Sequence, residues 1–224
     1  MAKIGFLHTS PVHVPTFAAL MKSALAEDEI LYRVDEQLLA YAMEHGSDSH
    51  VVERVDGYLR DLQARGCEEV VCTCSTLGPI AEEMHLDGMR ISRIDRPMAA
   101  DAVRRGHVIL MVAAIRSTLL PTRELILDES EKQRKPIQIV DLIVESAWPH
   151  FLAGDLEAYY QTIAQEIEAF LSDGTRCHAK LKPDVIVIAQ ASMAPAADLL
   201  NHLSQPVLTS PKLCAEAVIN NLSN

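Results

Sequence analysis

The sequence predicts an α/β protein built from two similar lobes, each a four-stranded, mainly parallel sheet flanked by helices. Short apolar runs alternate with helical patterns along all 224 residues. Several of these runs are almost continuously apolar, which is typical of strands in a parallel sheet that is covered on both faces. The sequence also nearly repeats itself, which indicates two lobes related by a pseudo-two-fold axis, with an active-site cleft between them.

The repeat is clearest where VVCTCSTLGPIAEEM and IVIAQASMAPAADLL are set in register. Pro79 then matches Pro195, and Cys74 matches Gln190. Pairs of segments agree in the same order along the chain: 15–16 with 121–122, 70–84 with 186–200, and 98–103 with 213–218. Agreement in the same order favours an internal duplication over chance similarity of strand–helix junctions.

The apolar runs are predicted as strands at 3–8, 30–34, 69–73, 90–94, 107–114, 137–144, 184–189 and 206–209. Helical stripes lie at 47–65, where Gly66 ends the helix, and at 155–172, where Gly174 ends it. A helix opens at Pro97 and closes at Gly106. We expect the first lobe to span 1–96, with a C-terminal helix within 210–224 packing back onto it, and the second to span 97–209.

The composition excludes several classes of protein. A net charge of -11 and a pI near 5.2 argue against binding to nucleic acid or to an anionic membrane. MAKIGFLHTS does not have the pattern of a signal peptide, and no apolar run reaches membrane-spanning length. Five cysteines without regular spacing indicate reduced thiols, and therefore a cytoplasmic protein. We also expect a homo-oligomer.

CTCSTLG after a buried strand, VIVIAQASMAPAADLL and the terminal PVLTSPKLCAEAV resemble the aspartate/glutamate/hydantoin racemase superfamily, which also includes arylmalonate decarboxylase and maleate isomerase. The resemblance covers most of the chain. The superfamily carries one cysteine motif on each lobe. The first, Cys-Asn-Thr, maps onto Cys74-Ser75-Thr76, and the second maps onto Ala189–Ser192. The second catalytic cysteine is therefore absent, because Gln190 occupies its place.

Cys74 is the candidate catalytic residue. It comes where a strand ends and a helix begins near Pro79, so free backbone N–H groups and the helix dipole favour a thiolate there. A thiolate in that place can remove or deliver a proton at a carbon next to a carboxylate. Ser75, Thr76 and the nearby amides would hold the carboxylate or enolate oxygens of a small acid.

Gln190 changes the expected chemistry, because its amide neither gives up nor accepts a proton near neutral pH, although it can hydrogen-bond an oxygen. The sequence therefore leaves three readings open. The first is an enzyme that transfers a proton with Cys74 alone, including a lyase or a decarboxylase. The second is an amino-acid or hydantoin racemase with a base other than cysteine, for which His8 is the candidate. The third is a non-catalytic protein that binds small carboxylates.

Other polar residues follow the predicted strands. Those expected to bind substrate besides Ser75 and Thr76 are Ser10, Thr118, Gln190 and Ser192. The side chain of His8 faces either the substrate or the interior of the sheet, and the sequence does not choose. Asp35-Glu36 is interpreted as the acidic start of a helix, and Arg116 as a solvated loop residue.

No cofactor or metal is expected from these motifs. Cys67, Cys72 and Cys74 lack further ligands at convergent spacing, so a zinc site is discounted. Cys177-His178 precedes its strand at the N-terminal end and is interpreted as incidental. The glycine patterns of phosphate-binding and dinucleotide-binding loops are also missing from the sequence. The expected ligand is a small carboxylate substrate.

Overall fold

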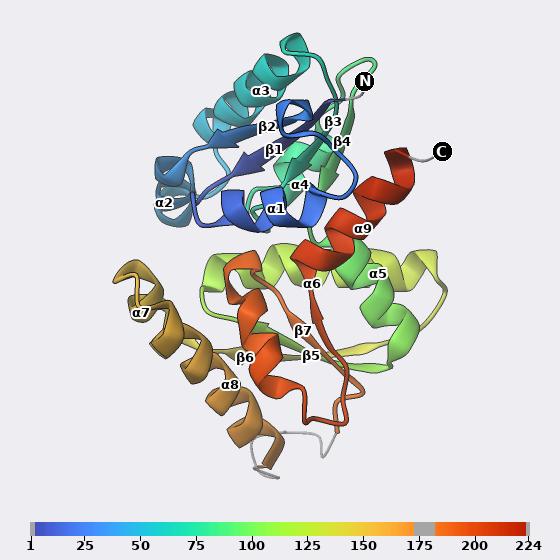
Figure 1. The fold of residues 1–224 in the computed structure, drawn as a ribbon. Coiled ribbons are helices and arrows are strands. Elements are labelled where there is room, and N and C mark those ends of the chain that lie inside the picture. Colours follow the sequence, from blue (N-terminus) through green and yellow to red (C-terminus); the bar gives the residue numbers. More distant parts are fainter. Residues whose placement is uncertain (1–2, 173–181, 223–224) are drawn as a thin grey trace. The chain divides into compact units, whose positions relative to one another are not determined.

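The computed structural model describes residues 3–172 and 182–222. The chain divides into two compact units. Unit 1 comprises Met1–Arg96 together with Pro211–Asn224, and unit 2 comprises Pro97–Ser210. Figure 1 labels the helices and strands of both units.

Unit 1 contains a four-stranded sheet in the order β2-β1-β3-β4, and all of its strand pairings are parallel. Its strands are β1 (Lys3–His8), β2 (Ile30–Val34), β3 (Cys67–Cys72) and β4 (Arg90–Arg93). Its helices are α1 (His13–Met21), α2 (Glu36–His45), α3 (Ser49–Ala64), α4 (Gly78–Glu83) and α9 (Ser210–Leu222). The strands alternate with helices because each parallel pairing needs a crossover connection.

Both faces of the unit 1 sheet are covered. On one face, Leu7 and Val70 belong to a core cluster with Val55 and Leu59 of α3. A Cβ atom on Gly5 would lie only 3.0 Å from the side chain of Val70, so glycine allows this close packing. On the other face, Phe6 packs against Phe17 of α1 with ring centres 4.7 Å apart.

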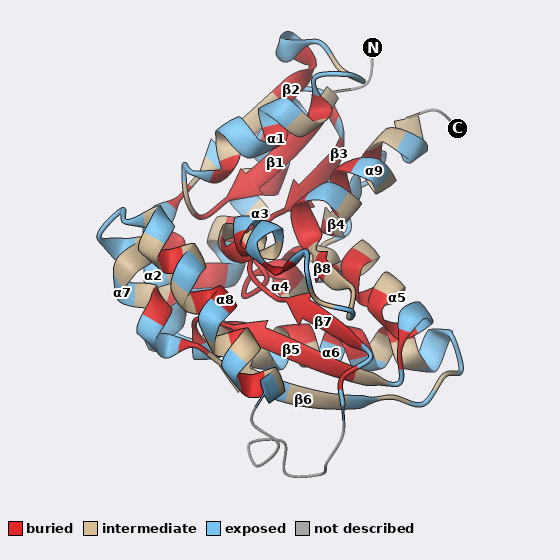
Figure 2. Cartoon of the chain, turned by 60° about the horizontal axis from the view of Figure 1, so that its bottom comes forward, coloured by how far each residue is buried: buried red, intermediate tan, exposed pale blue. Residues whose placement is uncertain are grey.

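Unit 2 repeats this arrangement with the strand order β6-β5-β7-β8, again with parallel pairings only. Its strands are β5 (Val108–Ala113), β6 (Gln138–Ile143), β7 (Val185–Ile188) and β8 (Val207–Thr209). Its helices are α5 (Arg96–Arg105), α6 (Leu119–Lys132), α7 (Trp148–Leu152), α8 (Leu156–Ser172) and the 3₁₀ segment η4 (Ala191–Leu200). Figure 2 shows the central strands β5 and β7 as buried.

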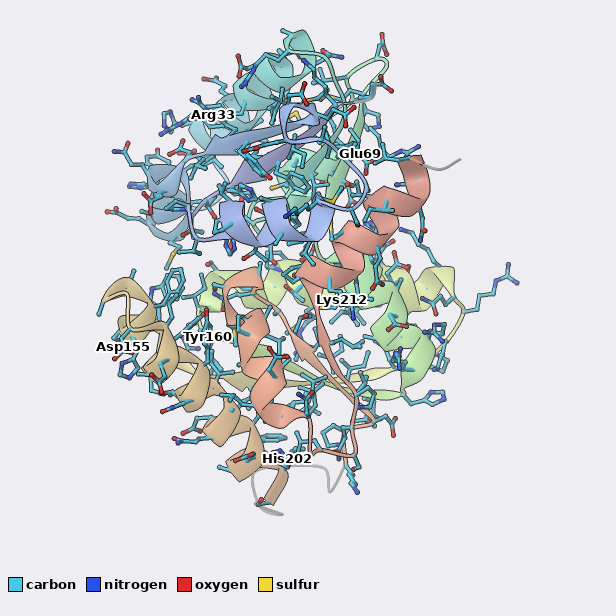
Figure 3. The ribbon with its side chains drawn as sticks, viewed as in Figure 1. Arg33, Glu69, Asp155, Tyr160, His202 and Lys212 are labelled. Atoms are coloured by element: carbon cyan, nitrogen blue, oxygen red, sulfur yellow. The ribbon has the colours of Figure 1, made fainter. Side chains whose placement is uncertain are left out.

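Helix α8 covers one face of the unit 2 sheet. Its residues Tyr159 and Ile163 belong to one core cluster with Val112 of β5 and Ile188 of β7. The helix begins after Asp155, whose carboxylate accepts a hydrogen bond of 3.1 Å from the N–H of Ala158 (Figure 3). The predicted stop of this helix at Gly174 lies outside the described residues.

The predicted fold class is confirmed, because both units contain a four-stranded parallel sheet flanked by helices. The boundaries differ from the expectation in places that local chemistry explains. The helix predicted over 47–65 begins at Ser49, because the Asp48 carboxylate caps it by accepting from the N–H of Val51 at 3.0 Å. The segment that contains Pro195 forms a 3₁₀ helix.

None of the described helices is long and apolar enough to cross a membrane.

A buried ion pair closes the end of β4. The guanidinium of Arg93 donates from Nε to Oδ1 of Asp95 at 2.6 Å and from Nη2 to Oδ2 at 2.9 Å. Arg93 is 4% exposed and Asp95 is fully buried. The same guanidinium packs against the start of α4, where a Cβ atom on Gly78 would lie 2.9 Å from its Nε atom. The pair therefore links β4 to the helix that follows Cys74.

Replacing Asp95 with alanine should destabilise the protein strongly, because Arg93 would stay buried without its two-pronged partner. We expect the free energy of unfolding to fall by about 3–5 kcal/mol, measured by urea denaturation followed by circular dichroism. Arg60→Ala breaks an exposed pair with Asp56 on α3 and should change the free energy of unfolding far less than Asp95→Ala does, because exposed ion pairs contribute little to stability. Equal stability of the two variants would show that the buried pair stabilises the fold no more than the exposed pair does.

Candidate functional site

Cys74 lies two residues beyond the end of β3, on a turn that backbone hydrogen bonds hold in place. The N–H of Thr73 donates to the carbonyl of Leu7 in β1 at 2.9 Å, which extends the sheet ladder by one step. The N–H of Leu77 then donates to the carbonyl of Cys74 at 3.1 Å, and α4 begins at Gly78. These bonds fix where the chain leaves the sheet and hence where the thiol is presented.

Unit 2 has the same turn around Gln190, two residues beyond β7. The N–H of Ala189 donates to the carbonyl of Val112 in β5 at 2.9 Å, and the N–H of Met193 donates to the carbonyl of Gln190 at 3.0 Å. The similarity of 70–84 and 186–200 is thus accompanied by a similar pattern of backbone hydrogen bonds. That Cys74 and Gln190 face one another across a cleft stays a prediction.

Cys74 is buried, with 8% of the residue exposed, and hydrogen-bond donors surround its sulfur. The thiolate form is favoured by hydrogen bonds from the Thr9 hydroxyl, from the N–H groups of Thr76 and Leu77, and from the Thr76 hydroxyl. Burial opposes them and is the larger effect, so the pKa of Cys74 lies above its ordinary value. At neutral pH the side chain is therefore a protonated thiol.

Thr9 follows β1 between His8 and Ser10, and its hydroxyl contributes to the surroundings of Cys74. The sequence analysis selected its neighbours His8 and Ser10, whereas the hydroxyl of Thr9 bonds the Cys74 sulfur. Strand register explains the contact, because Leu7 pairs with Cys72 across β1 and β3. Thr9 and Cys74 each come two positions after this pair, so they leave the sheet side by side.

His8 is enclosed in the sheet interior, one of the two orientations that the sequence left open. Its ring is fully buried, 5.6 Å between centres from Phe17 and 5.7 Å from Tyr32. Its Nδ1 atom lies 2.7 Å from the Thr73 hydroxyl, which itself donates to the carbonyl of Leu7 at 3.0 Å. The Thr73 oxygen therefore accepts from Nδ1–H, and Nε2 is left unprotonated.

The environment of His8 keeps it neutral. Burial, followed by the charge of His13, lowers the pKa of His8 to about 3, and burial lowers that of His13 to about 4. Among the residues that the structure describes, none forms a hydrogen bond with the buried Nε2 atom. This placement does not favour His8 as a second proton-transferring group.

The remaining predicted substrate-binding residues of unit 1 follow β1 and β3. Ser10 is partly buried, and Ser75 and Thr76 are buried beside Cys74. In unit 2, Thr118 is buried in the 3₁₀ turn before α6. The Ser192 hydroxyl lies 3.1 Å from the hydroxyl of the buried Tyr159.

The side chain of Gln190 is held by its oxygen. Oε1 accepts hydrogen bonds from the N–H groups of Ala114, at 2.6 Å, and Ile115, at 3.2 Å, directly after β5. These donors lie 76 and 75 positions away in the sequence, so no local signal indicated them.

Asp35 starts α2, as its sequence context indicated. Its Oδ1 atom accepts from the N–H of Leu38 at 3.1 Å, and its Oδ2 atom accepts from Tyr58 at 2.5 Å and from Arg54. Arg33, which Figure 3 labels, lies over the same tyrosine ring, with 4.3 Å between Cζ and the ring centre. Asp35 therefore serves the packing of unit 1.

The other polar candidates either form local contacts or lie outside the residues that the structure describes. Arg116 is exposed and pairs with Glu145, with 2.7 Å between Nε and Oε1. Over residues 3–172 and 182–222, no group of three or more histidine, cysteine or acidic side chains is arranged to hold a metal ion. Cys177 and His178 lie outside the described residues.

Comparisons with known proteins show similarity in structure but none in sequence. No family model and no curated protein sequence matches the chain. The aspartate racemase of Picrophilus torridus superposes with a TM-score of 0.74 at 17% identity, over 99% of this chain and 95% of that one. A glutamate racemase of Bacillus anthracis gives 0.65 at 12% identity, over 99% and 82%.

Arylmalonate decarboxylase, in a mutant form associated with a sulfate ion, gives a TM-score of 0.58 at 15% identity, over 99% of this chain and 93% of that one. The chain therefore has the fold of these racemases and of this decarboxylase. The fold that the sequence resemblance implied is confirmed.

The two buried histidines predict that stability falls in weak acid. Because their folded-state pKa values of about 3 and about 4 lie below the ordinary value of 6.5, the unfolded chain binds more protons between these pH values. Above pH 6.5 the two histidines should leave the free energy of unfolding unchanged. Below pH 6.5 each histidine should lower it by up to about 1.4 kcal/mol for every pH unit.

The measurement is urea denaturation at pH 7 and pH 5. The variant His8→Phe/His13→Phe should lose less stability between these two pH values than the unaltered protein. An equal loss in both proteins would assign the acid sensitivity to other groups.

Cys74 should be alkylated by iodoacetamide before Cys72. Cys72 is fully buried and its sulfur lies 3.7 Å from the carbonyl oxygen of Cys74, whereas Cys74 is 8% exposed. Because burial raises the pKa of Cys74, its labelling should accelerate as the pH is raised above neutral. Mass spectrometry of peptides separates the sites, and faster labelling of Cys72 would contradict the assignment.

Proposed function

We propose that this chain is an enzyme in which Cys74 alone transfers a proton at the carbon next to the carboxylate of a small acid. The fold supports a function of the racemase or isomerase type, because aspartate and glutamate racemases and arylmalonate decarboxylase share it. The proposed reaction uses the thiol itself and no cofactor. A cytoplasmic location and a homo-oligomer stay predictions.

The observation that carries the proposal is the set of hydrogen bonds at the Cys74 sulfur. Two backbone N–H groups and the hydroxyls of Thr9 and Thr76 stabilise a negative charge on that atom. A buried thiol that serves only as a small apolar side chain does not need such donors. At Cys72 burial also raises the pKa, far above the ordinary value, but the hydrogen bond that opposes burial there comes from the backbone of Cys74 and not from hydroxyl groups.

The protonated resting state suits the delivery of a proton. The carbanion or enediolate next to the carboxylate forms when the deprotonated sulfur takes the C2 proton, or when a malonate-type acid loses carbon dioxide from C2. The S–H bond then breaks, and a C–H bond forms on the same face of the carbon. The resulting thiolate is held by donors that are already in place, so little reorganisation is needed. Solvent then returns a proton to the sulfur. Ser10, Ser75, Thr76, Thr118 and Ser192 are proposed to hold the carboxylate and enediolate oxygens.

Proton transfer is proposed to occur on one face of the carbon. Gln190 has no titratable proton near neutral pH. His8 is enclosed in the sheet interior with a pKa of about 3. Both observations speak against the alternative of a racemase with a base other than cysteine. The hydrogen-bonded thiol speaks against a protein that only binds carboxylates.

Deuterium exchange tests the proposal. In D₂O, the protein should incorporate deuterium at C2 of one or more small acids from a panel of hydroxy acids, amino acids, malonates and hydantoins, and with one configuration only. Cys74→Ala should lower the rate by about 10²–10⁴-fold, as expected for loss of a positioned acid or base.

The matched control is Cys214→Ala, which removes another buried thiol of unit 1 and should keep the rate. NMR at C2 and optical rotation provide the readouts. Exchange that survives Cys74→Ala, or rapid racemisation that Cys74→Ala abolishes, would overturn the proposal of a single proton-transferring cysteine.

A further inference from the structure

Two side-chain hydrogen bonds join the end of β1 to the end of β3. The Thr9 hydroxyl binds the Cys74 sulfur. One residue earlier on each segment, Nδ1 of His8 lies 2.7 Å from the hydroxyl oxygen of Thr73. All four residues belong to unit 1. The bond at the sulfur is therefore followed directly by a second bond in which the sulfur takes no part.

Thr73, the residue before Cys74, is fixed through both its backbone and its side chain. Its N–H donates to the carbonyl of Leu7 at 2.9 Å, and its hydroxyl donates to the same carbonyl at 3.0 Å. The hydroxyl oxygen also accepts from Nδ1–H of His8. A residue with a locked rotamer and a bonded backbone holds its neighbour in a defined position. The direction in which the chain enters Cys74 is fixed in this way.

The stability of the fold does not account for a histidine at position 8. The ring lies among aromatic side chains, with its centre 5.9 Å from that of Phe6 and 5.6 Å from that of Phe17. A phenyl ring would fill such a place without leaving a buried nitrogen unsatisfied, which costs free energy. Among the described residues, the hydrogen bond that the imidazole makes is the one from Nδ1 to Thr73.

We propose that His8 and Thr73 are positioning residues of the Cys74 site. Their hydrogen bond holds the end of β3 so that the sulfur stays within reach of the Thr9 hydroxyl and of the N–H groups that follow it. Neither residue exchanges a proton with a substrate, because both act through the turn. The inference rests on the proposed function in taking Cys74 as the reacting group, but the state of the sulfur is measured without a substrate.

The titration of Cys74 on the full chain tests the inference. The rate of alkylation by iodoacetamide is followed against pH by mass spectrometry of peptides, and its midpoint reports the pKa of the thiol rather than its exposure. His8→Phe removes the donor to Thr73. The midpoint should rise by about one pH unit, the size expected when hydrogen bonds to a charged group weaken. A purely structural role predicts a loss of stability in urea with an unchanged midpoint.

Further variants separate the hydrogen bond from the packing. Thr73→Val keeps the shape of the side chain without the hydroxyl and should raise the midpoint as His8→Phe does. His8→Asn keeps an N–H at the same number of bonds from Cα as Nδ1, and Thr73→Ser keeps the hydroxyl, so both should retain the original midpoint. The matched control is His13→Phe, the same substitution on α1 at a ring centre 5.9 Å from that of His8, which should change nothing at Cys74.

A midpoint that stays unchanged or falls in either His8→Phe or Thr73→Val would overturn the inference. An equal rise in His13→Phe, His8→Asn or Thr73→Ser would do the same. If one of the two decisive variants does not fold, the other decides.

Deuterium exchange at C2 distinguishes this inference from the proposed function. The variants that raise the midpoint should exchange at least about 10-fold more slowly, because the reacting group is displaced. Exchange that depends on Cys74 while both midpoints stay unchanged would refute the positioning role and leave the proposed function standing. Raised midpoints without any exchange that depends on Cys74 would support the positioning of the sulfur and refute the proposed function.

Discussion

Both units depend on one constraint, which is that a parallel sheet covered on both faces leaves polar side chains room only beyond the ends of its strands. The central strands pair on both sides, so their backbone groups are satisfied by neighbours and their side chains enter the core. Polar side chains are therefore found on the turns that follow the strands. In unit 1 the ladder continues to Thr73, and in unit 2 it continues to Ala189, so the next residue leaves each sheet at a defined point.

The thiol of Cys74 shows how burial and hydrogen bonding oppose each other at such a point. Burial alone makes a cysteine an inert apolar side chain, which is the situation of Cys72 one strand step earlier. Two residues further on, the chain has begun to turn into α4, and its N–H groups are no longer used by the sheet. They point at the sulfur together with the hydroxyl of Thr9. The difference between the two cysteines therefore comes from the backbone around them.

The sequence was sufficient to predict the strands, the two sheets and the position of Cys74, because these follow from periodicity and from the order of elements along the chain. It was insufficient where a contact depends on the pairing of distant segments. Thr9 reaches Cys74 through the register of Leu7 with Cys72, and Gln190 reaches Ala114 through the pairing of β5 with β7. The orientation of His8 depends on which face of β1 receives Phe17.

The division of the chain has a consequence for biosynthesis. Unit 2 is inserted into unit 1, since α9 follows β8 in the sequence but belongs with the first unit. Glu69 of β3 is 5% exposed and is hydrogen-bonded by Asn221 of α9. While the ribosome is still synthesising unit 2, that carboxylate lacks its partner from α9. The first unit to emerge is therefore the last to be completed, because Asn221 must leave the ribosome before it can reach Glu69.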